Sequence, residues 1–114
     1  KEAQSPFLVA MIEHINALNE LEKILEVKEL DAILIGPYDL SSSMNLTGKF
    51  EDQKFLDVMK EIKAKADNAK VPCGVHVVEP NESEFNKKLD EGYRFIPYSI
   101  DAVVLQKYIR NPKL

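Results

Sequence analysis

Two carboxylate residues in the sequence each come directly after a short apolar run. Glu13 follows residues 7–12, and Asp39 follows residues 32–35 and the turn-forming pair Gly36-Pro37. If both runs are strands of one parallel sheet, their carboxyl ends lie at the edge where α/β proteins build ligand sites. Two oxygen ligands on neighbouring strands suit a hard divalent ion such as Mg²⁺ or Mn²⁺. Such an ion could act as a Lewis acid toward a 2-oxo acid.

A simpler interpretation exists for each acid. Asp39, in an Asp-Leu-Ser context, is also typical of a helix cap or a turn. Glu13 could be a solvated residue that opens a helix. The metal hypothesis rests on the two acids occurring in the same position after two similar apolar runs.

The elements around these acids alternate between strand and helix patterns. The predicted strands are residues 7–12, 32–35, 71–78 and 93–98, each rich in apolar or β-forming residues. Helical spacing predicts helices over 16–26 and 55–66, one from Asn81 or Ser83 to Gly92, and one after Ser99 or Asp101. A polar, serine-rich loop is expected over residues 41–48.

This order amounts to four βα units, which implies parallel strands joined by right-handed crossovers. One architecture that fits is a small open sheet of the flavodoxin-like type. The other is half of a (β/α)8 barrel, because a whole barrel needs about 250 residues. The sequence contains neither G-x-G-x-x-G nor a Walker loop, so the usual signals of nucleotide binding are missing.

Composition narrows the function further. The 114 residues carry a formal net charge of −4, and the basic residues are scattered, which argues against a nucleic-acid partner. A single cysteine fits a reducing compartment. No apolar run approaches 18 residues, so we expect no membrane association and a cytoplasmic location. Because the chain begins at Lys1 and not at Met, we expect a fragment or a processed piece.

Four segments together resemble the HpcH/HpaI aldolase family. Residues 11–25 look like the segment that opens the second half of those enzymes, and residues 33–43 (ILIGPYDLSSS) are similar to the family's G-P-x-D-L-S signature. Residues 74–80 (GVHVVEP) and 91–96 (EGYRFI) resemble its last two strands. The four segments occur in order and span nearly the whole chain.

The resemblance implies a metal-dependent (class II) pyruvate aldolase on a (β/α)8 barrel, of which this chain supplies the carboxyl-terminal half. It implies that Glu13 and Asp39 bind the divalent metal, Mg²⁺ or Mn²⁺, with Co²⁺ as a further candidate. It also implies that backbone amides around Gly36, Pro37 and Tyr38 hold the pyruvate carboxylate. Tyr38 is larger than the residue many members carry there, so we expect a reshaped substrate pocket.

The family's catalytic His and Arg belong to the first half of the barrel, and no segment here matches them. His14 and His76 are therefore interpreted as packed or loop residues, and Cys73 as a small core residue. Pro97 lies within the last predicted strand, where it removes a hydrogen-bond donor, so we expect a bulge or an early strand end there.

The function expected from these observations is cleavage of a 4-hydroxy-2-oxo acid to pyruvate and an aldehyde. An acyl-CoA lyase of the same superfamily and a non-catalytic half-barrel that binds a partner remain alternatives. The expected partners are the amino-terminal half of the barrel and a second copy of the chain in a homo-oligomer. These should cover inward-facing apolar residues, for which the candidates are Val9, Ile33, Ile35, Val75 and Ile96.

Overall fold

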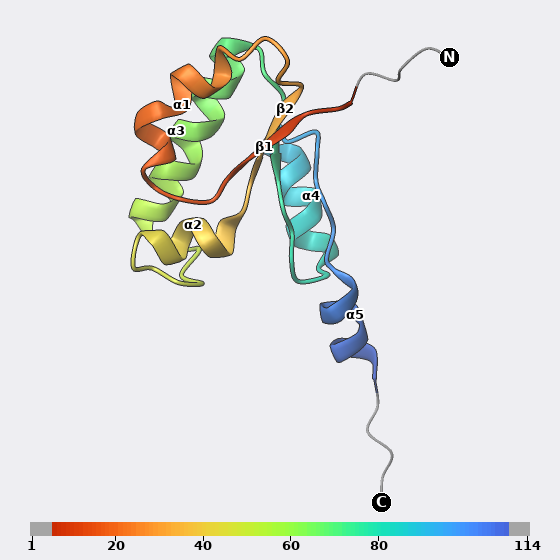
Figure 1. Cartoon of the computed structure of the whole chain (residues 1–114). Coiled ribbons are helices and arrows are strands. Elements are labelled where there is room, and N and C mark those ends of the chain that lie inside the picture. The colour runs from red at the N-terminus through yellow and green to blue at the C-terminus, as the bar shows by residue number, and fades with distance from the viewer. Residues whose placement is uncertain (1–5, 110–114) are drawn as a thin grey trace, which may run out of the picture.

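The computed structural model describes residues 6–109, which form an α/β fold built on a parallel sheet (Figure 1). Its strands are β1 (Val9–Ile12), β2 (Ala32–Ile35) and β3 (Cys73–Val75), adjacent and in sequence order. Val9 pairs with Ala32, and Ile33 pairs with Cys73. The prediction of parallel strands is confirmed for these elements. The described sheet does not reverse its winding, as a flavodoxin-like sheet would.

The fourth predicted strand, residues 93–98, is wrong as a continuous strand. Only isolated parallel bridges form, between Gly74 and Phe95 and between Val77 and Tyr98. The Val77 amide donates to the Pro97 carbonyl over 3.0 Å, but Pro97 has no N–H to return to a ladder. The segment therefore runs alongside β3 in the expected direction without completing a regular strand, and the expected interruption at Pro97 is confirmed.

The described helices follow their local sequence signals closely. They are α1 (Ala17–Leu25), α2 (Pro37–Ser43), α3 (Gln53–Ala69), α4 (Glu82–Asp90) and α5 (Asp101–Tyr108). The Asp52 side chain caps α3 by accepting from the Lys54 amide, and Asn81 caps α4 by accepting from the Glu84 amide. Helix α3 ends at Ala69, and the next residue, Lys70, caps it in the left-handed conformation with φ 59°.

The expected serine-rich loop beginning at residue 41 is wrong at its start, because α2 continues through Ser43. Pro37 in the first turn favours the helix, since its fixed φ is already helical and its missing N–H would be unpaired there. The Ser41 hydroxyl then donates to the Tyr38 carbonyl over 2.9 Å, and the Ser43 hydroxyl donates to the Leu40 carbonyl over 2.7 Å. The serines thus form side-chain bonds within the helix instead of opening a loop.

One face of the sheet is covered by helices. Helices α1 and α3 pack side by side against it (Figure 1). Lys63 of α3 and Lys88 of α4 both lie within 6 Å of the centre of the Tyr93 ring, so α4 stands on the same side as α3. The largest side chains with under 2% exposure centre on this face and are Ile12, Leu21, Ile33, Ile35, Leu40, Ser41, Ile62 and Val75.

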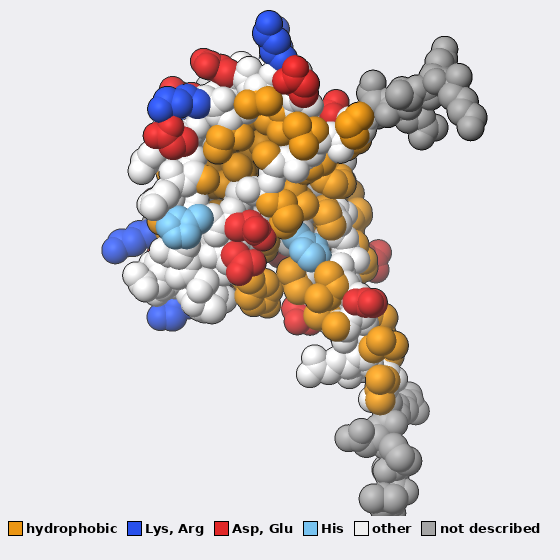
Figure 2. All heavy atoms as spheres, in the orientation of Figure 1, with side chains coloured by type: hydrophobic (Ala, Val, Ile, Leu, Met, Phe, Trp, Pro, Cys, Tyr) orange, Lys and Arg blue, Asp and Glu red, His pale blue; other side chains and the backbone are white. Residues whose placement is uncertain are grey.

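The opposite face is open, and the expectation of which residues point to it was partly wrong. Ile33, Ile35 and Val75 are fully buried beneath the helices, so no second half is needed to cover them. Side chains alternate along a strand, so the open face carries Leu34, between Ile33 and Ile35, and its partner Met11 on β1, which is 52% exposed. Figure 2 shows an extended hydrophobic surface over the sheet, with acidic side chains gathered near it.

Helices α4 and α5 contain no buried residue. Helix α5 projects away from the rest of the chain in Figure 1. None of the helices within residues 6–109 has the length and apolar character required to cross a membrane.

Candidate active site

Glu13 stands at the carboxyl end of β1, immediately after Ile12, and is half-buried. Its side chain lies against the backbone of Gly36, at the end of β2. A Cβ atom placed on Gly36 would be only 3.0 Å from both Cγ and Oε1 of Glu13. The glycine therefore leaves open the space beside β2 into which this carboxylate fits, and a side chain at position 36 would require the Glu13 side chain to shift by a few tenths of an ångström.

Asp39 lies in the first turn of α2 and is exposed. The turn that leads to it is fixed to β1 because the Gly36 amide donates to the Ile12 carbonyl over 3.1 Å. Ile12, directly before Glu13, is thus hydrogen-bonded to Gly36, which stands three residues before Asp39. Both acids are held at the same edge of the sheet, as predicted for residues that follow neighbouring parallel strands.

The donor chemistry fits a hard divalent cation. Both side chains offer carboxylate oxygens, the ligands such ions prefer. Within residues 6–109, neither carboxylate forms an ion pair, and no group of three His, Cys, Asp or Glu residues is placed to hold a metal. Within the described residues, Glu13 and Asp39 could supply at most two carboxylate ligands to such an ion, and its other ligands would have to come from water, substrate or other groups.

The amides of the same turn are not equivalent. Gly36 already uses its N–H on Ile12, and Pro37 has none. The Leu40 amide donates to the Gly36 carbonyl over 3.0 Å. Within residues 6–109, the amides of Tyr38 and Asp39 donate to no other group, and they lie in the first turn of the helix, where an anion is favoured. Sequence reasoning pointed to residues 36–38 and missed the Asp39 amide, although the absent N–H of Pro37 was a readable signal.

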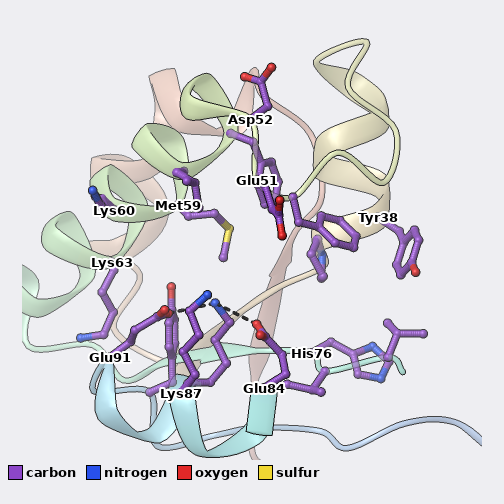
Figure 3. Close-up of a pocket in the computed structure, with 18 of the residues that line it drawn as sticks. Tyr38, Glu51, Asp52, Met59, Lys60, Lys63, His76, Glu84, Lys87 and Glu91 are labelled. Atoms are coloured by element: carbon purple, nitrogen blue, oxygen red, sulfur yellow. Dashed lines mark hydrogen bonds and ion pairs between the residues drawn. The ribbon is translucent and has the colours of Figure 1, made fainter. Parts of the chain in front are cut away.

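Tyr38 packs away from the two acids. Its ring meets Phe50 edge to face, with centroids 4.9 Å apart, and Phe50 in turn packs against Phe55. Tyr38 and Pro37 lie at the rim of a cleft of about 940 Å³ between α3 and α4 (Figure 3). Neither Glu13 nor Asp39 lines this cleft. The two acids therefore lie outside the cleft, which adjoins their turn through Pro37 and Tyr38. Within the cleft, Lys88 pairs with Glu84 and Glu91.

The two histidines have local structural partners. His14 is exposed, and its Nδ1 accepts from the Asn16 amide over 3.2 Å. The Nε2 of His76 lies 3.2 Å from the Ser99 carbonyl. These contacts agree with their interpretation as loop or packed residues.

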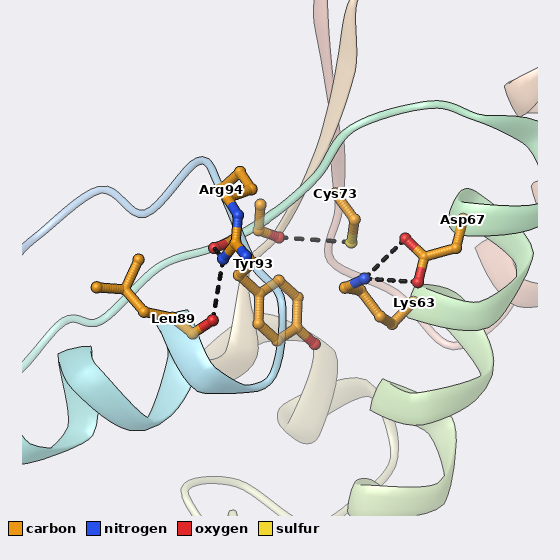
Figure 4. A network of polar contacts seen from close by, with 7 residues as sticks. Lys63, Asp67, Cys73, Leu89, Tyr93 and Arg94 are labelled. Carbon is orange, nitrogen blue, oxygen red and sulfur yellow. Dashed lines mark hydrogen bonds and ion pairs between the residues drawn. The ribbon is translucent and has the colours of Figure 1, made fainter.

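A second polar cluster, around Tyr93, is structural (Figure 4). Lys63 pairs with Asp67 over 2.6 Å above the buried Tyr93 ring. Burial raises the pKa of the Cys73 thiol to about 12 and raises the pKa of Tyr93 above its ordinary value. A thiol that stays protonated is a poor nucleophile, so the interpretation of Cys73 as a core residue is confirmed by its burial.

Comparison with known proteins shows the family to which the chain belongs. Residues 1–107 match the model of the HpcH/HpaI aldolase/citrate lyase family, and the chain belongs to that family. The match covers the segments that carry Glu13, Asp39 and the Gly36-Pro37 turn.

Individual relatives agree with this placement. A hydroxypyruvate/pyruvate aldolase of Paraburkholderia phytofirmans is 30% identical over 106 residues, covering 90% of this chain and 39% of the relative. A 4-hydroxy-2-oxovalerate aldolase of Novosphingobium aromaticivorans is 29% identical, covering 88% of this chain and 36% of the relative. The crystal structure of an HpcH/HpaI aldolase from Desulfitobacterium hafniense superposes with a TM-score of 0.81 at 28% identity, covering 90% and 39% of the two chains. The chain thus spans about two fifths of the length of the curated relatives it matches.

Proposed function

We propose that this chain is the carboxyl-terminal half of a (β/α)8-barrel aldolase that cleaves a 4-hydroxy-2-oxo acid to pyruvate, or a similar keto acid, and an aldehyde. Lyase chemistry is supported by the family and by relatives named as pyruvate and 4-hydroxy-2-oxovalerate aldolases. The barrel is supported by parallel strands in sequence order and by a length near two fifths of those relatives.

One observation carries the assignment of the site: the Glu13 side chain lies against Gly36, at the start of the turn that leads to Asp39. In this proposal the two carboxylates hold a divalent metal at the strand ends. A cation bound there supplies Lewis-acid stabilisation of the negative charge that develops on the 2-oxo acid. Mg²⁺, Mn²⁺ and Co²⁺ all fit an oxygen site that is completed by water and substrate.

The remaining roles fall to the backbone and to the missing half. The free amides of Tyr38 and Asp39 bind the carboxylate of the 2-oxo acid, because that end of the helix favours an anion. The turn that presents them is held by the Gly36 amide bond to Ile12. Proton transfer and charge stabilisation at the reacting carbon then need the His and Arg that the family resemblance assigns to the first half.

The open face of the sheet also supports a barrel in which this chain supplies only one half. Phe7 and Met11 on or next to β1, and Phe95 at the other edge, are exposed apolar residues. Exposed sheet edges and apolar faces favour association. We propose that the amino-terminal half of the barrel covers this face, and that the assembled protein forms a homo-oligomer.

The test uses the native gene product, whose mass first establishes whether this chain is part of a longer protein. Mn²⁺ binding is then titrated, and pyruvate release is assayed, for wild type, Glu13→Gln and Asp39→Asn. Each variant removes one charged ligand, so we expect affinity to fall by about 100-fold or more and pyruvate release to fall with it. Glu51→Gln, a change at an exposed acid that lines the cleft and follows neither of the two strands, is the control.

Unchanged Mn²⁺ affinity in Asp39→Asn would refute the metal site. Metal binding without pyruvate release, in a gene product of this size, would favour the non-catalytic half-barrel. Activity toward an acyl-CoA thioester, without activity toward a 4-hydroxy-2-oxo acid, would favour the alternative of an acyl-CoA lyase.

A further inference from the structure

One side chain joins the two segments that carry the acids. The Ser43 hydroxyl accepts a hydrogen bond from the Ile15 amide over 2.9 Å and donates one to the Leu40 carbonyl over 2.7 Å. Ser43 is half-buried, and its bond to Ile15 spans 28 residues of sequence. A single oxygen atom therefore links the loop after β1 to helix α2.

The position of this link is what matters. Ile15 lies two residues beyond Glu13, and Leu40 lies one residue beyond Asp39. On the other side of Glu13, the Ile12 carbonyl accepts from the Gly36 amide over 3.1 Å. Glu13 is thus bracketed by two hydrogen bonds, one before it and one after it, and both lead to the segment that carries Asp39.

The neighbouring serines do not share this role. The Ser41 hydroxyl donates to Tyr38 and accepts from the Gly48 amide over 3.1 Å, so it ties α2 only to its own following loop. Ser42 is exposed, and its hydroxyl forms no hydrogen bond to another side chain or backbone group within residues 6–109. Of the three, only Ser43 reaches the loop that carries Glu13.

We propose that Ser43 is a positioning residue for the Glu13–Asp39 carboxylate pair, a role that rests on the proposed metal site. A hydroxyl is suited to it because it donates and accepts through one atom, and both functions are used here. Alanine would leave the Ile15 amide without this partner and release the Glu13 loop from α2. Groups that orient metal ligands in this way typically change metal affinity by about 10- to 100-fold when they are removed.

The experiment compares Ser43→Ala, Ser42→Ala and Ser43→Thr in the native gene product. Mn²⁺ affinity is measured by titration, and exchange of the Ile15 amide hydrogen is followed without metal. We expect Ser43→Ala to bind Mn²⁺ about tenfold more weakly and to exchange the Ile15 amide faster. Ser42→Ala should remain within about twofold of wild type, and Ser43→Thr, which keeps the hydroxyl, should recover most of the loss.

Asp39→Asn is measured in parallel, so that the two hypotheses fail separately. If Asp39→Asn loses Mn²⁺ but Ser43→Ala binds it as Ser42→Ala does, the positioning role is refuted and the metal site stands. If Asp39→Asn binds Mn²⁺ like wild type, the metal site is refuted and the role of Ser43 with it. Should Ser43→Ala fail to fold, Ser43→Cys replaces it, because a thiol is a weaker donor and acceptor. Unchanged Mn²⁺ affinity in Ser43→Cys would then overturn the proposal.

Discussion

The two faces of the sheet are built from the same strands yet have opposite surroundings. On one face Ile33, Ile35 and Val75 are essentially inaccessible beneath the helices. On the other face Met11 is 52% exposed, and at the sheet's edge Phe95 is 37% exposed. A strand that is apolar on both sides is typical of sheets covered on both faces. The described chain covers only one of them, and this difference is the main structural support for the proposed amino-terminal half.

The largest effect is expected on the covered face, at Ile33. Its side chain is fully buried in the core, so Ile33→Ala should lower the free energy of unfolding by about 2–5 kcal/mol. Urea unfolding followed by circular dichroism measures this. A loss below about 1 kcal/mol would mean that the helices do not seal this face, and the contrast between the faces would fail.

The next effect is expected where β3 meets the segment after α4. A Cβ atom on Gly74 would lie 2.5 Å from the Phe95 carbonyl oxygen and 2.8 Å from Phe95 Cδ1. Gly74→Ala must push that segment away, at a cost of about 1–3 kcal/mol. Amide exchange at Val75 and Val77 should accelerate, because these amides donate to Phe95 and Pro97. Gly48→Ala serves as a control for packing, because a Cβ atom there would meet no non-adjacent residue within 4 Å among residues 6–109, although its positive φ adds some strain of its own. Unaltered exchange in Gly74→Ala would show that residues 93–98 are not held against β3.

A smaller effect is expected at alkaline pH from the covered face itself. Burial raises the pKa of Cys73 from 9.0 to about 12. Below about pH 9 the thiol is neutral in both folded and unfolded chains, and the stabilisation is complete. Above it the unfolded chain loses its proton first, so the free energy of unfolding falls by up to about 1.4 kcal/mol per pH unit.

Cys73→Ala removes this dependence, so the variant should lose about 1 kcal/mol less than wild type between pH 8 and pH 10. Tyr93→Phe separates the contribution of Tyr93, whose pKa is also raised by burial and which therefore also lowers the free energy of unfolding as the pH rises. Parallel pH profiles for wild type and Cys73→Ala would indicate that the thiol is solvated in solution, and that this end of the covered face is open.

The sequence predicted the elements better than it predicted their faces. Alternating patterns and capping residues such as Asn81 placed the helices to within a few residues, because those signals are local. The run 32–35 is apolar throughout, so nothing in it distinguishes the covered face from the open one. Residues 93–98 look like a strand, but Pro97 limits their pairing.

For the candidate site too, local features were predictable from the sequence and contacts between distant residues were not. Glu13 and Asp39 were identified because each follows an apolar run, which is a property of the local sequence. The bond from Ile15 to Ser43 could not be predicted, since it depends on the approach of residues 28 positions apart. Serines in a row favour a loop by composition, and only the folded chain reveals which hydroxyl reaches across.

The smallest effect is expected on the open face, and it sharpens the comparison most. Met11→Lys replaces a side chain that is already 52% exposed, so the stability of the isolated chain should change by less than about 0.5 kcal/mol. When the amino-terminal half is supplied, the same lysine should weaken association strongly, because its charge would be buried without a partner. Val27→Lys, at a residue with 46% exposure between α1 and β2, should change neither the stability of the isolated chain nor its association with the other half. Sedimentation of each variant, alone and with the complementary half, measures association, and urea unfolding measures stability. If Met11→Lys destabilised the isolated chain by 2 kcal/mol or more, a second copy would already be covering the open face, and its association with a missing half would have to be reconsidered.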